Sequence, residues 1–392
     1  MDTIDETNKR PQLWSKNFIL ISIATFLIFC SFQILMPLLP KYAVSLGADT
    51  KALGLVNGIF AISAIALRPF IGRELDKRGR KKIYLVGLII FLLAVFGYIW
   101  VSSLILLLVL RLIHGAGWST ASTAAVTMVA DIIPSSRRGE GMGYYGLCSI
   151  LAMAIAPALG LFLLARYSFL PIFILSLIAC LLAIFAGQAI MLPPYPASNN
   201  KKTDKIALFD KRAIRVSLTL LFVTITYGVI VTFLPLYAEE RGIANIGIFF
   251  TIYAAALLIS RPLSGKYYDK KGPNMLILFG SLLLFIATFM LSLANDMPHF
   301  LLSGVLYGLG FGAVQPTIFA LAMLGIEPER RGAVNAMVMS AFDMGMGLGA
   351  IFLGYIANYI GYANMYLLSS FAPLLGLIIF FLDDNSKVIK KI

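Results

Sequence analysis

One acidic side chain in this sequence lies deep inside an apolar segment, where it could take up and release a proton. Among the 19 Asp and Glu residues, only Asp343 falls outside the termini, the loops and the end turns of the apolar segments. Asp343 lies about ten residues into the segment 333–357, and therefore ~15 Å from its start if the segment is helical. Ionisable groups at such a depth in a bilayer are typical of proton relays and substrate sites. We therefore expect Asp343 to couple protons or substrate, with a structural hydrogen bond to a neighbouring helix as the alternative.

Two further ionisable side chains lie inside the apolar segment 104–130. Arg111 is about seven residues from the start of this segment, and His114 follows one helical turn deeper on a similar face. A guanidinium within the membrane marks a functional site, unless its long side chain reaches the nearer interface. We expect Arg111 to be the electrostatic partner in proton coupling by Asp343. His114 is a candidate ligand for a proton or a substrate, although a single helix histidine is more often a hydrogen-bonded packing residue.

Long apolar segments must hold these side chains in place. The chain has 392 residues, of which 59% are hydrophobic and only 13% are charged, which is too apolar for a water-soluble domain. Runs of about 20 apolar residues cross a bilayer as helices. Twelve such segments are predicted, at 17–40, 52–71, 82–102, 104–130, 141–164, 168–191, 214–237, 246–265, 274–294, 299–322, 333–357 and 362–382. The expected fold class is therefore an all-α integral membrane protein.

The basic residues are distributed as in a membrane protein rather than as in a nucleic-acid-binding surface, although the formal net charge is +13. If the N-terminus is cytoplasmic, 27 of the 32 Lys and Arg residues fall on the cytoplasmic side, against four in the outer loops. This bias follows the positive-inside rule. We therefore expect a multi-pass protein of the cell membrane, with both termini cytoplasmic and no nucleic acid partner.

Two halves of the chain repeat each other in parallel. The segment Arg68–Gly79 shares Arg, Pro, Gly, Asp, Lys and the final Gly with Arg261–Gly272, which lies 193 residues further on. Parallel repeats in a membrane chain are typical of transporters in which one half rocks against the other. The predicted domains are a six-helix half at 1–192, a cytoplasmic linker at 193–213 and a second six-helix half at 214–392.

The repeated segment combines a glycine, a carboxylate and basic residues at the predicted cytoplasmic end of a helix. An Asp there can interact with helix N-termini of the opposite half, which carry a partial positive charge. We expect Asp76 to cap the helix that begins near Gly332, and Asp269 the helix that begins near Gly139, when the inner gate is closed. The alternative is that these residues only set the membrane topology. The predicted gate residues are Gly72, Asp76, Lys77, Gly79, Arg80, Arg137, Arg138, Gly265, Asp269, Arg330 and Arg331.

These segments resemble the signatures of the major facilitator superfamily. Gly72–Lys82 matches its loop signature G-x-x-x-D-[RK]-x-G-[RK]-[RK]-[RK]. Arg111, Gly115 and Gly117 match its helix 4 signature R-x-x-x-G-x-G. The resemblance covers nearly the whole chain. It implies twelve transmembrane helices in two pseudo-symmetric six-helix bundles, with alternating access to a site between them.

The fifth predicted helix is similar to the antiporter signature G-x-x-x-G-P-x-x-G-G of the same family. Pro157 and Gly160 are kept, whereas Ala152, Ala156 and Leu161 replace three of the glycines. This resemblance implies export in exchange for protons, as in the twelve-helix drug/proton antiporter branch. A proton-coupled importer of the same fold is the alternative.

Uncharged polar residues inside the predicted helices are candidates for a substrate cavity. In the family, helices 1, 4, 7 and 10 line this cavity, which favours Gln33, Tyr227, Tyr307 and Gln315 here. The same residues could instead form hydrogen bonds between helices. A cavity lined by amide and aromatic groups suits an amphipathic or aromatic solute better than a phosphorylated sugar.

Sequence patterns for covalent chemistry are absent: there is no Walker A sequence, no H-E-x-x-H and no nucleophile–base pair. Cys30, Cys148 and Cys180 lie within apolar segments and are expected to be packing residues rather than metal ligands. We therefore expect a transporter and not an enzyme, with no cofactor and no metal. Its expected partners are a small-molecule substrate, protons and the lipid bilayer, and the expected state is a monomer. The main hypothesis is proton-coupled export of a small amphipathic or drug-like solute, and a less favoured alternative than the importer is a non-transporting membrane sensor or assembly protein.

Overall fold

Helices account for all regular structure in the described part of the chain. The computed structural model describes residues 12–134, 137–192, 211–324, 326 and 331–382. The helices of the first half are α1 (Lys16–Leu35), α2 (Leu38–Ser45), α3 (Thr50–Arg78), α4 (Arg80–Gly97), α5 (Leu104–Ile132), α6 (Arg138–Leu164) and α7 (Phe169–Ala189). Those of the second half are α8 (Lys211–Glu240), α9 (Gly247–Lys271), α10 (Asn274–Leu293), α11 (Met297–Met323) and α12 (Arg331–Leu382). A short 3-10 helix, η2 (Tyr98–Trp100), follows α4.

Within this described part, eleven helical spans are long and apolar enough to cross a membrane. The last span, Val334–Leu382, has 49 residues, more than twice the length of about 20 residues that one crossing needs. It is interrupted at Gly361, whose φ of 78° and ψ of 166° are not helical. α12 therefore supplies two crossings, which confirms the predicted twelve.

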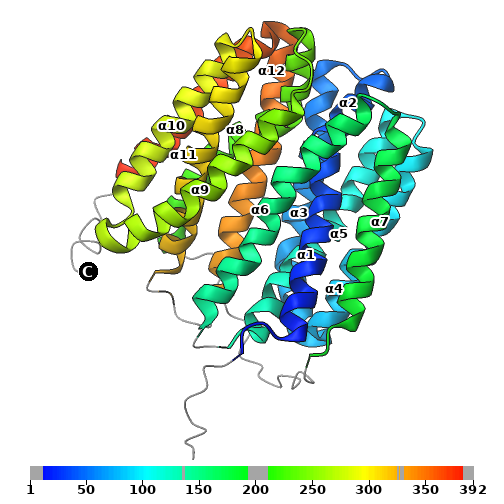
Figure 1. Cartoon of the computed structure of the whole chain (residues 1–392), viewed down its shortest axis with the longest axis vertical. Coiled ribbons are helices and arrows are strands. Elements are labelled where there is room, and N and C mark those ends of the chain that lie inside the picture. Colours follow the sequence, from blue (N-terminus) through cyan, green and yellow to red (C-terminus); the bar gives the residue numbers. More distant parts are fainter. Residues whose placement is uncertain (1–11, 135–136, 193–210, 325, 327–330, 383–392) are drawn as a thin grey trace, which may run out of the picture.

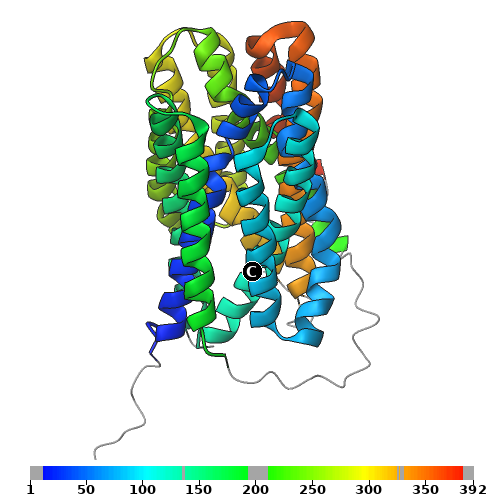
Figure 2. The ribbon, with the colours of Figure 1, turned by 90° about the vertical axis from the view of Figure 1, so that its right-hand side faces the viewer.

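The helices form two bundles that lie side by side (Figure 1). The first half, α1 to α7, lies on the right of this view and the second half, α8 to α12, on the left. A turn of 90° shows that the helices run along one common axis (Figure 2). In the first half α1 packs on α6 and α7, and α5 packs on α3 and α4. In the second half α8 packs on α12, and α11 packs on α9 and α10, while the halves meet where α3 contacts α12 and α6 contacts α9.

The repeat found in the sequence is also a repeat of helix packing. A Cβ atom on Gly115 of α5 would lie 2.3 Å from the carbonyl oxygen of Phe60 on α3. A Cβ atom on Gly308 of α11 would likewise lie 2.3 Å from the carbonyl oxygen of Tyr253 on α9. Each residue of the second pair follows its counterpart by 193 positions. Because only glycine permits such an approach of two backbones, the same helix crossing is built twice.

The repeated segments are more helical than the sequence predicts. The helix predicted at 52–71 continues to Arg78, and α9 also passes its predicted end to reach Lys271. Both helices stop at a glycine with positive φ, which is 84° at Gly79 and 76° at Gly272. Charged residues at the edge of the membrane terminate the apolar run in the sequence, but the helix continues through them. The end of the helix depends on the backbone conformation that glycine adopts at low cost.

The first predicted helix, 17–40, is broken into two. α1 ends at Leu35 and α2 begins at Leu38. Pro37 between them has no N–H donor, and its ring would clash with the preceding turn of a continuous helix. The proline therefore explains the break. A prediction from the hydropathy of the segment 17–40 does not detect such a break.

The predicted linker 193–213 lies mostly outside the described residues. α8 begins at Lys211, inside the predicted linker, and residues 193–210 are not described. The division into domains at 1–192, 193–213 and 214–392 stays a prediction.

Candidate functional site

Asp343 forms an ion pair that joins the two halves. The Nε atom of Arg68 donates to Asp343 Oδ2 at 2.9 Å, and its Nη2 atom lies 2.7 Å from the same oxygen. Arg68 belongs to α3 and Asp343 to α12, so the pair crosses the boundary between the halves. Only 8% of the Arg68 side chain and 6% of the Asp343 side chain are exposed. Arg68 Nη1 also donates to Thr123 Oγ1 of α5 at 3.4 Å, so three helices meet at this site.

The stability of a protein with a buried ion pair of this kind depends strongly on whether both partners are charged. Removing one partner leaves an unpaired buried charge, which destabilises a protein by about 3–5 kcal/mol. Protonation of the carboxylate removes its charge without requiring any movement of the backbone. The site can therefore convert binding of a proton at Asp343 into a weaker connection between α3 and α12.

The sequence predicts Arg111 as the electrostatic partner of Asp343, whereas the structure pairs Asp343 with Arg68. Arg68 lies inside the predicted helix 52–71, so the rule that marks Arg111 as an intramembrane charge applies to it as well. Arg68 also recurs as Arg261 in the second half. A basic residue that recurs near the predicted cytoplasmic end of a helix is readily attributed to membrane topology, and this hides its role as an intramembrane charge. Which arginine reaches Asp343 is decided by helix packing.

Glycines bring α3 and α12 into close contact on the N-terminal side of Arg68 in α3 and on the C-terminal side of Asp343 in α12. A Cβ atom on Gly54 would lie 2.1 Å from the carbonyl oxygen of Ala350. A Cβ atom on Gly347 would lie 2.4 Å from the Cβ atom of Ala61. Beside the ion pair is a crevice of about 280 Å³, lined by Ala61, Ile62, Ile65, Ala66, Asp343, Met344, Gly347 and Leu348. Asp343 thus borders a small, mainly apolar space at one end of a tightly packed helix pair.

Replacing Gly54 with Ala is expected to destabilise the protein by about 1–3 kcal/mol, the range for overpacking of a close-packed interior. The added methyl group would meet the backbone of Ala350, which cannot move aside without shifting α12. Gly143→Ala is the matched control, because nothing lies within 4 Å of a Cβ atom at Gly143 in α6. The midpoint of thermal unfolding is expected to fall in Gly54→Ala alone. Equal midpoints for the two variants would contradict the close approach of α3 and α12.

Arg111 is fully buried in the first half, and its hydrogen bonds go to neutral groups. Its Nε atom donates to the carbonyl oxygen of Val56 at 2.6 Å, and its Nη2 atom to Asn57 Oδ1 at 2.7 Å. The guanidinium carbon lies 4.4 Å from the centre of the Phe60 ring. No ion pair of Arg111 is found among the described residues. Arg111 therefore stays inside the bundle instead of reaching the interface, and its part in coupling stays a prediction.

His114 is bound to its neighbours within the first half. Its Nδ1 atom lies 2.9 Å from the Tyr98 hydroxyl and 3.3 Å from Arg111 Nη1. Because a guanidinium can only donate, Nδ1 accepts in the contact with Arg111. The Nε2 atom has no hydrogen-bond partner among the described residues, and the Phe91 ring lies at 4.2 Å in an edge arrangement. These contacts suit the packing role that was the alternative for His114, while its role in proton coupling stays a prediction.

Polar contacts also join the first half to α8 of the second half. Asn57, which binds Arg111, donates from Nδ2 to Thr232 Oγ1 of α8 at 2.9 Å. Lys41 of α2 forms an ion pair with Glu239 of α8, with Nζ 2.7 Å from Oε2. These contacts connect the first half with α8, so the halves are linked by polar groups at several levels along the helices.

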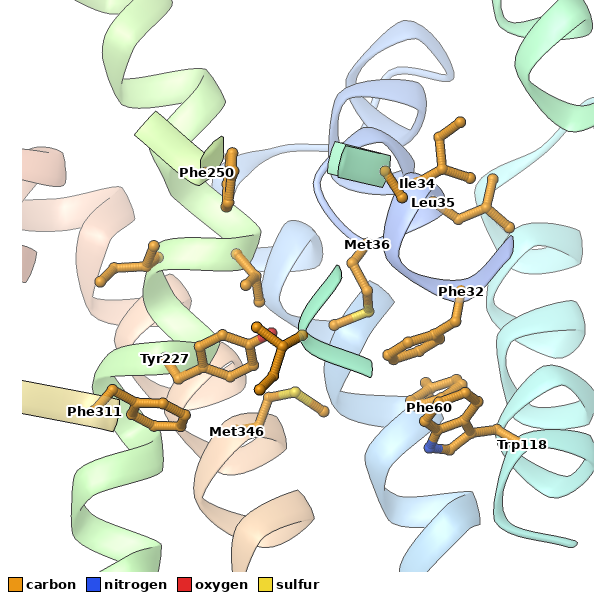
Figure 3. Close-up of a cluster of buried hydrophobic side chains, with 14 of the residues drawn as sticks. Phe32, Ile34, Leu35, Met36, Phe60, Trp118, Tyr227, Phe250, Phe311 and Met346 are labelled. Carbon is orange, nitrogen blue, oxygen red and sulfur yellow. The ribbon is translucent and has the colours of Figure 1, made fainter. Parts of the chain in front are cut away.

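Aromatic side chains from both halves gather in the space between them (Figure 3). In the first half, Phe32 stacks on Trp118 with ring centres 4.1 Å apart and on Phe60 with ring centres 5.1 Å apart. In the second half, Tyr227 stacks on Phe311 with ring centres 5.4 Å apart. Aromatic rings bury large apolar areas and present flat faces. These rings are at most 7% exposed, so the apolar part of a solute can contact them only when the halves move apart.

The four predicted cavity residues all take part in hydrogen bonds between helices. Gln33 Nε2 donates to the Tyr227 hydroxyl at 3.4 Å, across the two halves. The Tyr307 hydroxyl lies 2.9 Å from a threonine hydroxyl of α8. Gln315 Oε1 accepts from Arg261 Nη2 at 2.6 Å. These contacts suit the alternative of hydrogen bonds between helices, and the lining of a cavity by these residues stays a prediction.

Most predicted gate residues fall outside the part of the chain whose side chains are described. They are Gly72, Asp76, Lys77, Arg138, Asp269, Arg330 and Arg331. Among the others, Gly79 separates α3 from α4, and Arg80 forms an ion pair with Asp131 of α5. A Cβ atom on Gly265 would meet nothing within 4 Å, and Arg137 directly precedes α6. Capping of opposing helices by the gate stays a prediction.

The segment that resembles the antiporter signature packs against the first predicted helix. Pro157 lies inside α6. A Cβ atom on Gly160 would lie 2.7 Å from Ile34 Cγ1 and 2.8 Å from Leu38 Cδ1. Gly160 therefore permits α6 to lie against the point where α1 breaks into α2, and its role in antiport stays a prediction.

Sequence comparison finds relatives along nearly the whole chain. The profile of the Major Facilitator Superfamily matches residues 21–339 and also 216–391. The chain is 26% identical over 384 residues to the staphylopine export protein of Staphylococcus aureus, covering 93% of this chain and 95% of that protein. It is 27% identical over 372 residues to a multi-drug resistance efflux pump PmrA homolog of Lactococcus lactis, covering 89% of this chain and 90% of that protein.

Solved structures share the fold at low sequence identity. The human organic anion transporter MFSD10 (TETRAN) has a TM-score of 0.73 at 17% identity, with 95% of this chain and 100% of that chain covered. A bacterial homolog of the human lysosomal transporter Spinster, inward-facing and unoccupied, has a TM-score of 0.75 at 16% identity. In that case 98% of this chain and 99% of the other are covered. These likenesses concern the arrangement of the helices.

Proposed function

Because this chain belongs to the Major Facilitator Superfamily, and is thus a membrane transporter and not an enzyme, we propose that it exports a small amphipathic solute in exchange for protons. The observation that carries the proposal is the buried ion pair between Arg68 and Asp343. It is a titratable connection between two halves that move relative to one another during alternating access. We place the protein in the cell membrane with both termini cytoplasmic, as the basic flanks of the helices favour.

In the proposed cycle, the charged pair holds α3 against α12. Uptake of a proton by Asp343 neutralises the carboxylate and leaves Arg68 with its weaker contact to Thr123. The halves then separate at this point, and loss of the proton on the other side of the membrane restores the pair. A proton shifts the balance between two states only if it binds them with different affinities. An ion pair present in one state alone supplies that difference.

Export is favoured over import by two observations. Pro157 and Gly160 keep part of the antiporter signature in α6. Two relatives along most of the chain are named as an export protein and as an efflux pump homolog. In this proposal Asp76 and Asp269 hold the inner gate by capping helices of the opposite half, and the aromatic surface between the halves receives the apolar part of the solute.

Uptake by everted membrane vesicles tests the function and its direction. Vesicles that contain the protein and an acidified interior are offered ethidium and carboxyfluorescein, one cationic and one anionic amphipathic dye. An exporter is expected to accumulate a dye above the level of vesicles without the protein, and a protonophore is expected to abolish the difference. Accumulation only in right-side-out vesicles placed in an acidic medium would indicate a proton-coupled importer. Equal dye content with and without the protein, in both orientations, would contradict proton-coupled transport of such solutes.

A further inference from the structure

The repeat gives Arg68 a counterpart that lacks a carboxylate. Arg261 follows Arg68 by 193 positions, and the first half has Ile150 at the position that matches Asp343. Ile150 lies in α6 and Arg261 in α9, and these helices contact each other. The junctions of α3 with α12 and of α6 with α9 are therefore equivalent. The first holds an ion pair, whereas the second has an arginine and an isoleucine at the matching positions.

Arg261 is only partly satisfied by its surroundings. Its Nη2 atom donates to Gln315 Oε1 at 2.6 Å, whereas its buried Nε atom has no hydrogen-bond partner among the described residues. No ion pair of Arg261 is found in that part of the chain. An unpaired cation within the membrane is costly and marks a functional site by default. Arg261 thus has capacity for an anionic ligand.

Arg261 lies on the face of α9 that is directed between the halves. Phe250 of α9 belongs to the cluster of side chains between the halves in Figure 3. Arg261 follows Phe250 by 11 residues, which is about three helical turns, so the two residues share one face of the helix.

Tyr253 offers a second unused group on the same helix. Its hydroxyl is buried without a hydrogen-bond partner among the described residues, and Tyr253 precedes Arg261 by eight residues, which is about two helical turns. Side chains on a helix lean towards its N-terminus, so the guanidinium of Arg261 leans towards Tyr253. A guanidinium and a hydroxyl can both donate to one carboxylate, in charge-assisted hydrogen bonds.

We propose that Arg261 and Tyr253 bind the carboxylate of the transported solute, which is then an aromatic or amphipathic carboxylate. This proposal rests on the transport function proposed above and adds the chemical class of the solute. The Tyr253 ring lies 6.5 Å from the ring of Phe311, which stacks on Tyr227, so the apolar part of the solute has an aromatic surface beside the carboxylate. The solute carboxylate supplies to the α6–α9 junction the charge that Asp343 supplies to the α3–α12 junction. Solute and proton thus act on equivalent junctions of the two halves.

Direct binding tests this proposal without a pH gradient. Purified protein in phosphatidylcholine nanodiscs is titrated with benzoate, 2-naphthoate, indole-3-acetate and N-benzoylglycine, and with the uncharged amide of each. We expect at least one carboxylate to bind about tenfold tighter than its amide, the factor that a charge-assisted hydrogen bond supplies. Arg261→Gln is expected to remove this preference, and Arg261→Lys to keep part of it. Arg241→Gln, just after α8, is the control that keeps the preference in full.

Ile150→Asp is a second test that leaves Arg261 in place. The new carboxylate would stand at the position that matches Asp343 and is expected to pair with Arg261, so the preference for carboxylates is lost here too. The proposal is overturned if no carboxylate binds better than its amide, or if the preference survives both Arg261→Gln and Ile150→Asp. These experiments measure binding and not flux. Carboxylate binding can therefore be found even if the transport assay shows that Asp343 does not couple protons, so failure of one proposal is distinguished from failure of the other.

Discussion

Asp343→Asn is expected to abolish transport driven by a pH gradient, while the protein still inserts in the membrane. The amide cannot ionise, so the junction of α3 with α12 can no longer respond to protons. Arg68 also loses its ion-pair partner. Dye accumulation in everted vesicles is therefore expected to fall to the level of vesicles without the protein. The amount of inserted protein, measured by immunoblot of the same vesicles, separates lost coupling from lost expression.

Asp296→Asn is the matched control for this prediction. Asp296 caps α11, with its Oδ1 atom accepting from the backbone N–H of His299 at 3.0 Å. Asn caps a helix about as well as Asp, so this substitution removes one carboxylate at little cost in stability. We expect Asp296→Asn to keep proton-driven flux. Unchanged flux in Asp343→Asn would rule out Asp343 as the proton carrier, and loss of flux in both variants would make the assay uninformative about position.

Arg68→Gln is expected to destabilise the protein by about 3–5 kcal/mol, because it leaves the buried Asp343 carboxylate without its cation. The double variant Arg68→Gln with Asp343→Asn removes both charges at once. It is expected to recover most of the stability, since a neutral buried pair leaves no uncompensated charge. The midpoints of thermal unfolding of the protein, the two single variants and the double variant form a double-mutant cycle that measures the interaction.

Flux in the double variant separates stability from coupling. We expect it to unfold near the midpoint of the unsubstituted protein and yet to show no transport driven by a pH gradient, because neither side chain can bind a proton in the working range. If the two single substitutions simply add in the double variant, the ion pair contributes nothing to stability. If the double variant transports with the proton gradient, the coupling group lies elsewhere.

The fold could be predicted because its signals are local in sequence. The helix expected at 104–130 is found at Leu104–Ile132, since an apolar run of that length has no other stable form in a bilayer. The ends of helices were less predictable. α3 passes through charged residues and stops only where Gly79 takes up a positive φ, and α1 stops before Pro37. Both ends depend on backbone geometry and not on hydropathy.

The site was only partly predictable. The depth of Asp343 follows from counting along one apolar segment, and the repeat follows from comparing residues 193 positions apart. The partner of Asp343 is Arg68, which is 275 residues away, although Arg111 has the same chemistry and also lies in an apolar segment. Both arginines satisfy every local criterion for an intramembrane site.

Composition, the repeat and the presence of a carboxylate about ten residues inside an apolar segment are therefore properties that the amino-acid sequence settles without any coordinates. The tertiary structure alone decides that Arg68 meets Asp343, that Arg111 binds Val56 and Asn57, and that Arg261 has no acidic partner in the described part of the chain. The physical reason is that a contact between helices depends on how each helix is rotated about its axis and how closely the backbones approach. Those quantities are set by packing between distant segments, and no local pattern encodes them.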